Sequence, residues 1–83
     1  MEKILVHILV PAIGLETDAL IPSSIKVDDA TTLLSKAVET VSRGFYIPMG
    51  SEVVCVERLG LTFVPGTDIS MYGLMNGDKL VLI

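Results

Sequence analysis

Few side chains in this 83-residue sequence could do chemistry, and their surroundings favour structural roles. His7 is the single histidine, and its spacing shows no cysteine partner and no acidic neighbour, so a sheet-face position is favoured over a proton shuttle. Cys55 is the single cysteine and lies among valines, which favours a small packing residue over a reactive thiol. A metal site of the cysteine–histidine type needs more ligands than these two residues supply.

Two other polar clusters are better explained by backbone geometry. Asp28 and Asp29 directly precede an apolar periodic segment, where carboxylates cap a helix and suit its positive end. Asn76-Gly77-Asp78 has the composition of a tight turn and lacks the glycine spacing of a phosphate loop. We therefore expect no catalytic, cofactor-binding or metal-binding residues, and a protein that is not an enzyme.

Composition limits the class of protein further. The net charge is -4 and the six basic residues are scattered, which argues against nucleic-acid binding. Hydrophobic residues make up 51% of the chain, enough for one aliphatic core, so residues 1–83 are expected to form a single domain. The apolar run 4–10 is far shorter than the roughly 20 residues that cross a bilayer, and we expect no signal peptide and no membrane insertion. A single cysteine fits a reducing compartment, so a cytoplasmic protein is predicted.

Periodicity predicts strands at both ends of the chain. Residues 3–10 alternate as a strand with Ile4, Val6, Ile8 and Val10 on one face. Residues 11–18 are predicted to be a loop, and residues 19–27 a second strand with Ile21, Ile25 and Val27 inward. Pro22 cannot donate a ladder hydrogen bond, so this strand belongs at a sheet edge. Residues 79–83 are apolar on both faces and are predicted to occupy the centre of the sheet.

The middle of the chain is predicted to be one helix followed by short strands. The helix opens at Asp28 or Asp29, ends at Gly44, and presents one apolar face formed by Ala30, Leu33, Leu34, Ala37, Val38 and Val41. An apolar loop over residues 45–50 leads to strands at 52–58 and 61–64. A helical turn over residues 67–73, capped by Thr67 or Asp68, leads to the final strand.

This order of elements resembles the ubiquitin-like β-grasp over essentially the whole chain. The best local evidence is Ile69-Ser70-Met71-Tyr72-Gly73-Leu74, which is similar to the Leu-Ser-x-Tyr turn that precedes the last strand of ubiquitin. The resemblance implies an α+β fold in which a mixed sheet of order 2-1-5-3-4 packs on one helix. It also implies that Ile69 and Leu74 fill the core and that the Tyr72 hydroxyl bonds to nearby backbone.

Within that superfamily, residues 73–80 are similar to the Gly-Ile-Thr-Asn-Gly-Asp-Arg-Leu run of the small bacterial YukD/EsaB-like proteins. That likeness implies an accessory role in type VII secretion, which exports small helical proteins in Gram-positive bacteria. The alternative is a carrier or modifier protein activated at its C-terminus. Such proteins end in Gly-Gly on a free tail, whereas Leu80-Val81-Leu82-Ile83 is expected to lie inside a strand, which disfavours the alternative.

One surface is predicted to bind protein. If the helix covers one face of the two central strands, the outward residues form an apolar patch on the other face, namely Leu5, His7, Leu9, Val81 and Ile83. Either Val53 and Cys55 or Val54 and Val56 would extend this patch, depending on the register of the third strand. We expect a protein partner or a homodimer at this patch, unless the loop over residues 11–18 folds across it.

Overall fold

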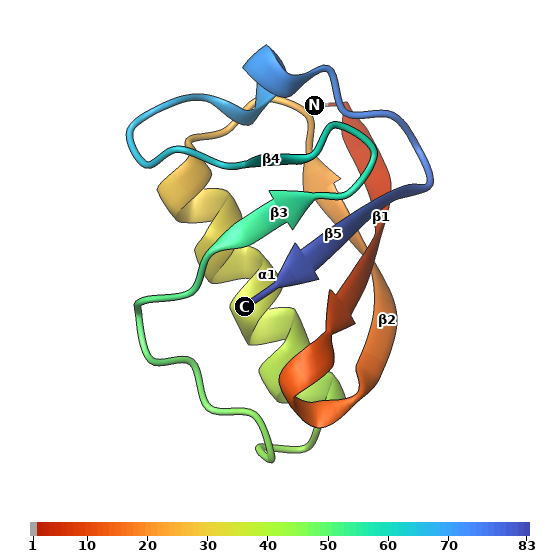
Figure 1. Ribbon diagram of the computed structural model, residues 1–83, viewed down its shortest axis with the longest axis vertical. Helices are drawn as coiled ribbons and strands as arrows, with labels where there is room; N and C mark the ends of the chain where they lie inside the picture. Colours follow the sequence, from red (N-terminus) through yellow and green to blue (C-terminus); the bar gives the residue numbers. More distant parts are fainter. Residues whose placement is uncertain (1) are drawn as a thin grey trace.

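The computed structural model describes residues 2–83, which form one helix and a five-stranded sheet (Figure 1). The strands and the helix are β1 (Lys3–Val10), β2 (Leu15–Pro22), α1 (Val27–Val41), β3 (Val54–Val56), β4 (Leu61–Thr62) and β5 (Asp78–Leu82). Two short 3-10 helices, η1 (Pro11–Ile13) and η2 (Ile69–Tyr72), complete the fold. No helix within residues 2–83 is long and apolar enough to cross a membrane.

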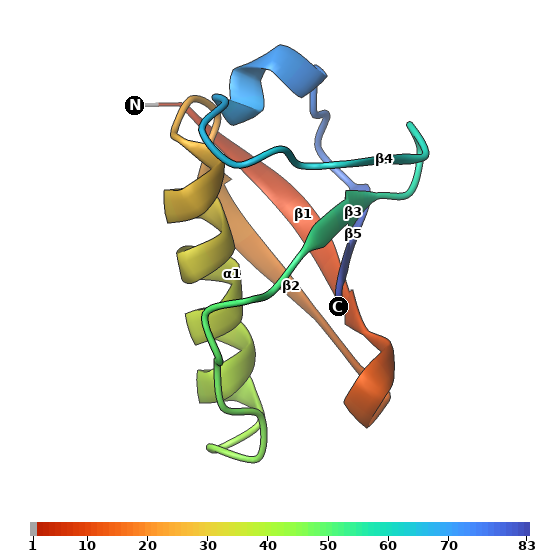
Figure 2. The same cartoon turned by 60° about the vertical axis from the view of Figure 1, so that its left-hand side comes forward.

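The strand order is β2-β1-β5-β3-β4, which confirms the predicted order. β1 and β5 pair in parallel at the centre, and the other neighbouring strands pair antiparallel. β2 lies at one edge, as the proline near its end indicated. α1 covers one face of the sheet, and Figure 2 shows the opposite face of β1 and β5 without an element across it. We call this opposite face the outer face.

The hairpin between β1 and β2 corrects the predicted loop over residues 11–18. Pro11–Ile13 forms one 3-10 turn, and Gly14 adopts a left-handed φ of 61°. β2 then begins at Leu15, so residues 15–18 pair with residues 7–10 and β2 pairs with β1 along its full length. The inward side of β2 is formed by Leu15, Thr17, Ala19 and Ile21. This alternation was not recognised in the sequence, because Glu16, Thr17 and Asp18 are polar and resemble a loop. The predicted second strand, residues 19–27, therefore ends too late, since Val27 belongs to α1.

The start of α1 also differs from the prediction. Lys26 is the N-cap residue and makes no side-chain capping bond, so neither Asp28 nor Asp29 caps the helix. Both carboxylates lie in the first turn, where the positive helix end favours them. The helix ends in a Schellman arrangement, because Arg43 N donates to Thr40 O at 3.1 Å and Gly44 N donates to Glu39 O at 2.9 Å.

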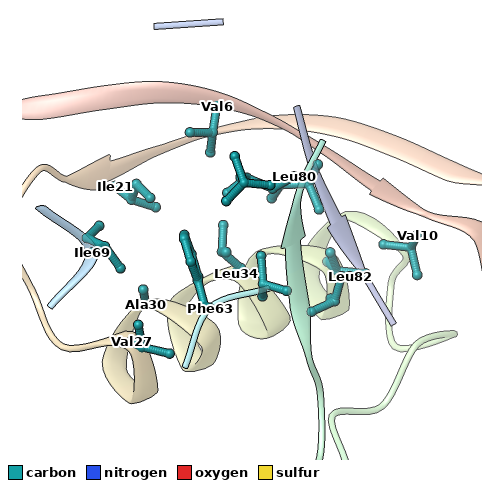
Figure 3. Close-up of a cluster of buried hydrophobic side chains, with 14 residues drawn as sticks. Val6, Val10, Ile21, Val27, Ala30, Leu34, Phe63, Ile69, Leu80 and Leu82 are labelled. Atoms are coloured by element: carbon teal, nitrogen blue, oxygen red, sulfur yellow. The ribbon is translucent and has the colours of Figure 1, made fainter. Parts of the chain in front are cut away.

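The core lies between α1 and the inner face of the sheet (Figure 3). Leu80 and Leu82 are buried against α1, as predicted. The buried helix residues are Val27, Ala30, Leu34, Ser35 and Val38. Leu33 and Val41, which were predicted to belong to the apolar face, are exposed. The buried face of α1 is therefore narrower than the sequence pattern predicted. Ser35 is part of this buried face, and its hydroxyl has a partner there because it donates to Thr31 O at 2.8 Å.

The segment around η2 agrees with the ubiquitin-like turn. Ile69 is fully buried, and Leu74 packs partly buried against the core. The Tyr72 hydroxyl accepts a hydrogen bond from Val64 N at 2.9 Å. Asp68, rather than Thr67, is the N-cap, because its Oδ1 accepts from Ser70 N at 3.0 Å.

The third and fourth strands are shorter than predicted. β3 comprises three residues instead of 52–58, and β4 comprises two instead of 61–64. Backbone pairing continues beyond them, since Val53 and Ile83 exchange hydrogen bonds of 3.0 and 2.9 Å. After β4, Phe63 N still donates to Val54 O at 2.9 Å, and Pro65, two residues later, cannot donate to a ladder.

Candidate protein-interaction surface

The sequence-predicted surface residues all lie on the outer face. Along β1, Leu5, His7 and Leu9 alternate with the buried Val6, Ile8 and Val10, so they point away from α1. In the C-terminal strand, Val81 alternates with the buried Leu80 and Leu82, and Ile83 follows with the same parity. No segment of residues 11–18 covers this face, because these residues form the hairpin turn and the first half of β2.

The register brings three apolar side chains into one line across the sheet. Leu9 lies beside Val81, and Val81 lies beside Cys55. We call Leu9, Val81 and Cys55 the apolar row; all three are half-buried. The next position along the strands pairs Val53 with Ile83, both exposed. This decides the register that the sequence left open, since Val54 and Val56 are buried on the inner face and Val53 and Cys55 point outward.

Leu5 belongs to a separate apolar area. The register places it opposite Leu20 on β2, and both are exposed. Between Leu5 and Leu9 the same face carries His7, whose strand neighbours are Asp18 and Lys79. The predicted patch is therefore not continuous from Leu5 to Ile83, because a row of charged residues, Asp18, His7 and Lys79, lies across it. Glu16 and Asp18 were missed because β2 was predicted to start four residues too late, and Leu20 was missed because the register that pairs it with Leu5 was not known.

His7 sits between two carboxylates on the outer face. Its Nδ1 lies 2.7 Å from Asp18 Oδ1, and its Nε2 lies 2.8 Å from Glu16 Oε1. Hydrogen bonding to Glu16 and then to Asp18 raises the pKa of His7 above its ordinary value of 6.5. Only the doubly protonated ring donates to both carboxylates, so the cluster favours the imidazolium. The expectation that His7 has no acidic neighbour was wrong.

This arrangement provides an ion cluster rather than a reaction centre. Both ring nitrogens of His7 are engaged by carboxylates, so neither is directed at a nucleophile. Within residues 2–83 no group of three or more histidine, cysteine or acidic residues is arranged to hold a metal ion. What the outer face offers is apolar area with fixed charges beside it.

Comparison with known proteins defines the fold. No family model matches the sequence, and no curated protein matches it. Solved ubiquitin-like domains match it closely in structure, so the chain has the ubiquitin-like β-grasp fold. The ubiquitin-like domain of Dsk2 from Plasmodium falciparum is similar with a TM-score of 0.76 and 21% identity, over 98% of this chain and 96% of that domain.

Two further solved structures are similar to this chain. The EccD5 ubiquitin-like domain from Mycobacterium xenopi has a TM-score of 0.80 and 16% identity, over 100% of this chain and 94% of that domain. A chain of the MycP5-free ESX-5 inner membrane complex has a TM-score of 0.77 and 17% identity. That match covers 100% of this chain and 21% of the larger one. Both structures therefore share the fold with this chain, in one case as a part of a longer protein.

Proposed function

We propose that this chain is a non-enzymatic interaction module that binds a partner protein through the apolar row and the flanking Val53 and Ile83. The observation that carries the proposal is the adjacency of Leu9, Val81 and Cys55 on three neighbouring strands, on a face that no other element of residues 2–83 crosses. Exposed apolar area of this kind is unfavourable in water at about 25 cal/mol per Å². A partner that covers it therefore gains binding free energy.

The charges beside the row indicate the chemistry of the partner. Glu16 lies next to Leu9 on the edge strand, and Asp18 lies two residues further along the same strand. Protonated His7 neutralises part of this acidic edge. A partner is expected to present apolar side chains to the row and a basic side chain toward β2.

We further propose that the module serves as a cytoplasmic accessory of bacterial type VII secretion. The likeness of residues 73–80 to the YukD/EsaB-like run supports this role. Structural similarity to the EccD5 domain and to a chain of the ESX-5 inner membrane complex supports it independently. The partner is then a component of the secretion machinery.

Titration calorimetry of this chain against purified components of the type VII secretion machinery tests the proposal. The wild type should bind one component, and the double variant Leu9→Lys/Val81→Lys should bind it at least tenfold more weakly, since two apolar contacts are replaced by charges. Met71→Lys is the matched control, because Met71 is exposed on η2 and lies outside the outer-face surface. Equal binding by all three proteins would exclude the apolar row, and no binding to any component would exclude the secretion role.

A further inference from the structure

The loop between α1 and β3 exposes three large apolar side chains that the outer face does not explain. Phe45, Ile47 and Met49 are 77%, 69% and 84% exposed. Tyr46 and Pro48 alternate with them and are half-buried. The segment is thus an extended strip with one apolar edge in solvent, and Figure 1 shows it beside the last turn of α1.

Hydrogen bonds donated to a single carboxylate fix the shape of this loop. Glu52 accepts from the Tyr46 hydroxyl at 3.0 Å, from Met49 N at 2.6 Å and from Gly50 N at 3.0 Å. At its other end, Ser42 Oγ accepts from Tyr46 N at 2.9 Å. A loop held in this way loses little conformational entropy on binding, which benefits docking into a shaped protein groove. A lipid surface needs no such fixed spacing, and the net charge of -4 opposes anionic headgroups.

The chain itself contains a groove with matching properties. It has a volume of about 530 Å³ and lies between the first half of α1 and the segments around residues 48–54 and 63–65. Its apolar lining includes Val27, Pro48, Val53, Phe63 and Pro65. Asp28 also lines it, and its carboxylate is exposed.

The charges at the two sites are opposite. Arg43 is exposed and lies two residues before Phe45. The ion pairs within residues 2–83 are those of His7 and Arg58, so Arg43 has no acidic partner in the described chain. The loop therefore carries a free positive charge at Arg43, whereas the groove is lined by the acidic Asp28 and Glu52 and by the basic Lys36, so acidic residues outnumber basic ones there.

The positions of the loop and the groove suit a two-fold axis. The loop begins just after the C-terminal end of α1, and its later residues Pro48 and Gly50 form part of one wall of the groove beside the N-terminal half of the helix. Two copies with antiparallel α1 helices bring each loop to the groove of the other copy, and both contacts form at once. Because the helix has 15 residues and is about 22 Å long, both contacts fit along one side of a molecule whose longest extent is 31 Å.

We propose that this chain forms a two-fold dimer in which Phe45 and Ile47 of each copy enter the groove of the other, with Arg43 facing Asp28. This dimer uses the helix side of the molecule and leaves the apolar row and Ile83 free for a partner protein, with Val53 as the one residue common to the groove and the partner surface. It therefore differs from a homodimer formed through the outer face, and the two arrangements respond to different substitutions.

Sedimentation equilibrium of the wild type and of three variants tests the proposal. The wild type should dimerise with a dissociation constant below about 1 mM, as expected of a small interface. Ile47→Lys should raise this constant at least tenfold, because one buried apolar contact is replaced by a charge. Met71→Lys, at a side chain that is 73% exposed, and the outer-face variant Leu9→Lys/Val81→Lys should leave it unchanged.

Exchanging the charges of Arg43 and Asp28 tests whether these two residues face each other across the dimer. Arg43→Asp alone should weaken the dimer, and aspartate tolerates the positive φ of 56° at this position. Combining it with Asp28→Arg restores the opposite charges across the axis, so the double variant should dimerise more tightly than either single variant. Thermal melts of each variant establish that the monomer is folded.

Three results would overturn the inference. A wild type that stays monomeric at millimolar concentration excludes the dimer. A dimer that survives Ile47→Lys but not Leu9→Lys/Val81→Lys uses the outer face. Failure of the double charge exchange to exceed both single variants excludes the Arg43–Asp28 pairing. None of these outcomes bears on partner binding by the outer face, which is measured separately.

Discussion

Arg58 holds the buried carboxylate of Asp78 with two hydrogen bonds, from Nε at 2.8 Å and from a terminal guanidinium nitrogen at 2.9 Å. Asp78 is only 6% exposed and also accepts from Met75 N at 2.8 Å. The same arginine donates to Gly73 O at 3.0 Å, so it connects the end of η2 to the start of β5. This ion pair fixes the turn that leads into the central strand.

Removal of the Asp78 carboxylate should destabilise the fold. Asp78→Ala leaves Met75 N and the Arg58 guanidinium without their acceptor, so the free energy of unfolding should fall by roughly 2–3 kcal/mol. Urea denaturation measures the loss. The neighbouring exposed Lys79 provides the control, since Lys79→Ala should change little.

The same carboxylate makes stability sensitive to acid. Hydrogen bonds from Arg58 are the main cause that lowers the pKa of Asp78 below its ordinary value of 3.8. The contribution to stability is therefore fully present above that value and is lost as the pH falls through the lowered pKa. Urea melts between about pH 6 and pH 2 should show a steeper loss for the wild type than for Asp78→Asn. Parallel curves would mean that other carboxylates cause the acid sensitivity.

Truncation of the central core should have the largest effect. Leu80 has 0% exposure and lies between the sheet and α1, so Leu80→Ala should cost about 2–5 kcal/mol through lost burial and the cavity left behind. A urea melt that shows a loss below about 1 kcal/mol would contradict this role.

The Tyr72 hydroxyl should contribute a smaller amount. Tyr72→Phe removes the acceptor of Val64 N and a contact of 3.1 Å with Thr67 Oγ1, while the ring keeps its packing on Phe63. The expected loss is about 1 kcal/mol without a change of fold. Thermal unfolding measures it, and an unchanged midpoint would show that water replaces the hydroxyl without cost.

His7 should make stability depend on pH in the opposite direction. Because its pKa is raised in the folded state, its contribution is present below the ordinary value of 6.5 and is lost as the pH rises through the raised pKa. The difference in stability between the wild type and His7→Gln should therefore be larger near pH 5.5 than near about pH 9. An NMR titration of the ring protons checks the cause, and a midpoint at or below 6.5 would contradict it.

The secondary structure was predictable wherever the hydrophobic residues followed one clear spacing along the sequence. β1 and the centre of α1 follow directly from alternating and helical spacing, and the central place of the last strand follows from its apolar faces. The start of β2 was not predictable in this way, because Glu16 and Asp18 face outward beside the only partly buried Thr17. An edge strand with a polar outer side has the composition of a loop.

The candidate site was predictable only in part for the same reason. Parity along each strand identified the outward residues, but their neighbours depend on register, which a sequence pattern does not supply. The acidic partners of His7 therefore became visible only with the pairing of β1 and β2. The exposure of Phe45 was hidden as well, because local hydrophobicity does not show whether a loop side chain packs on the core or faces solvent.

The parallel pairing of β1 and β5 has a consequence for synthesis of the chain on the ribosome. β5 lies between the β1–β2 hairpin and the β3–β4 pair, and Asn76 Oδ1 also accepts from Leu5 N across 71 positions of sequence. Until residues 78–82 leave the ribosome, the two halves of the sheet have no strand between them, and the core side of α1 lacks Leu80 and Leu82. Contacts this distant in sequence form late and slowly. Nascent chains stalled before Asp78 should therefore be cleaved readily by protease, and the resistance should rise sharply once β5 has emerged.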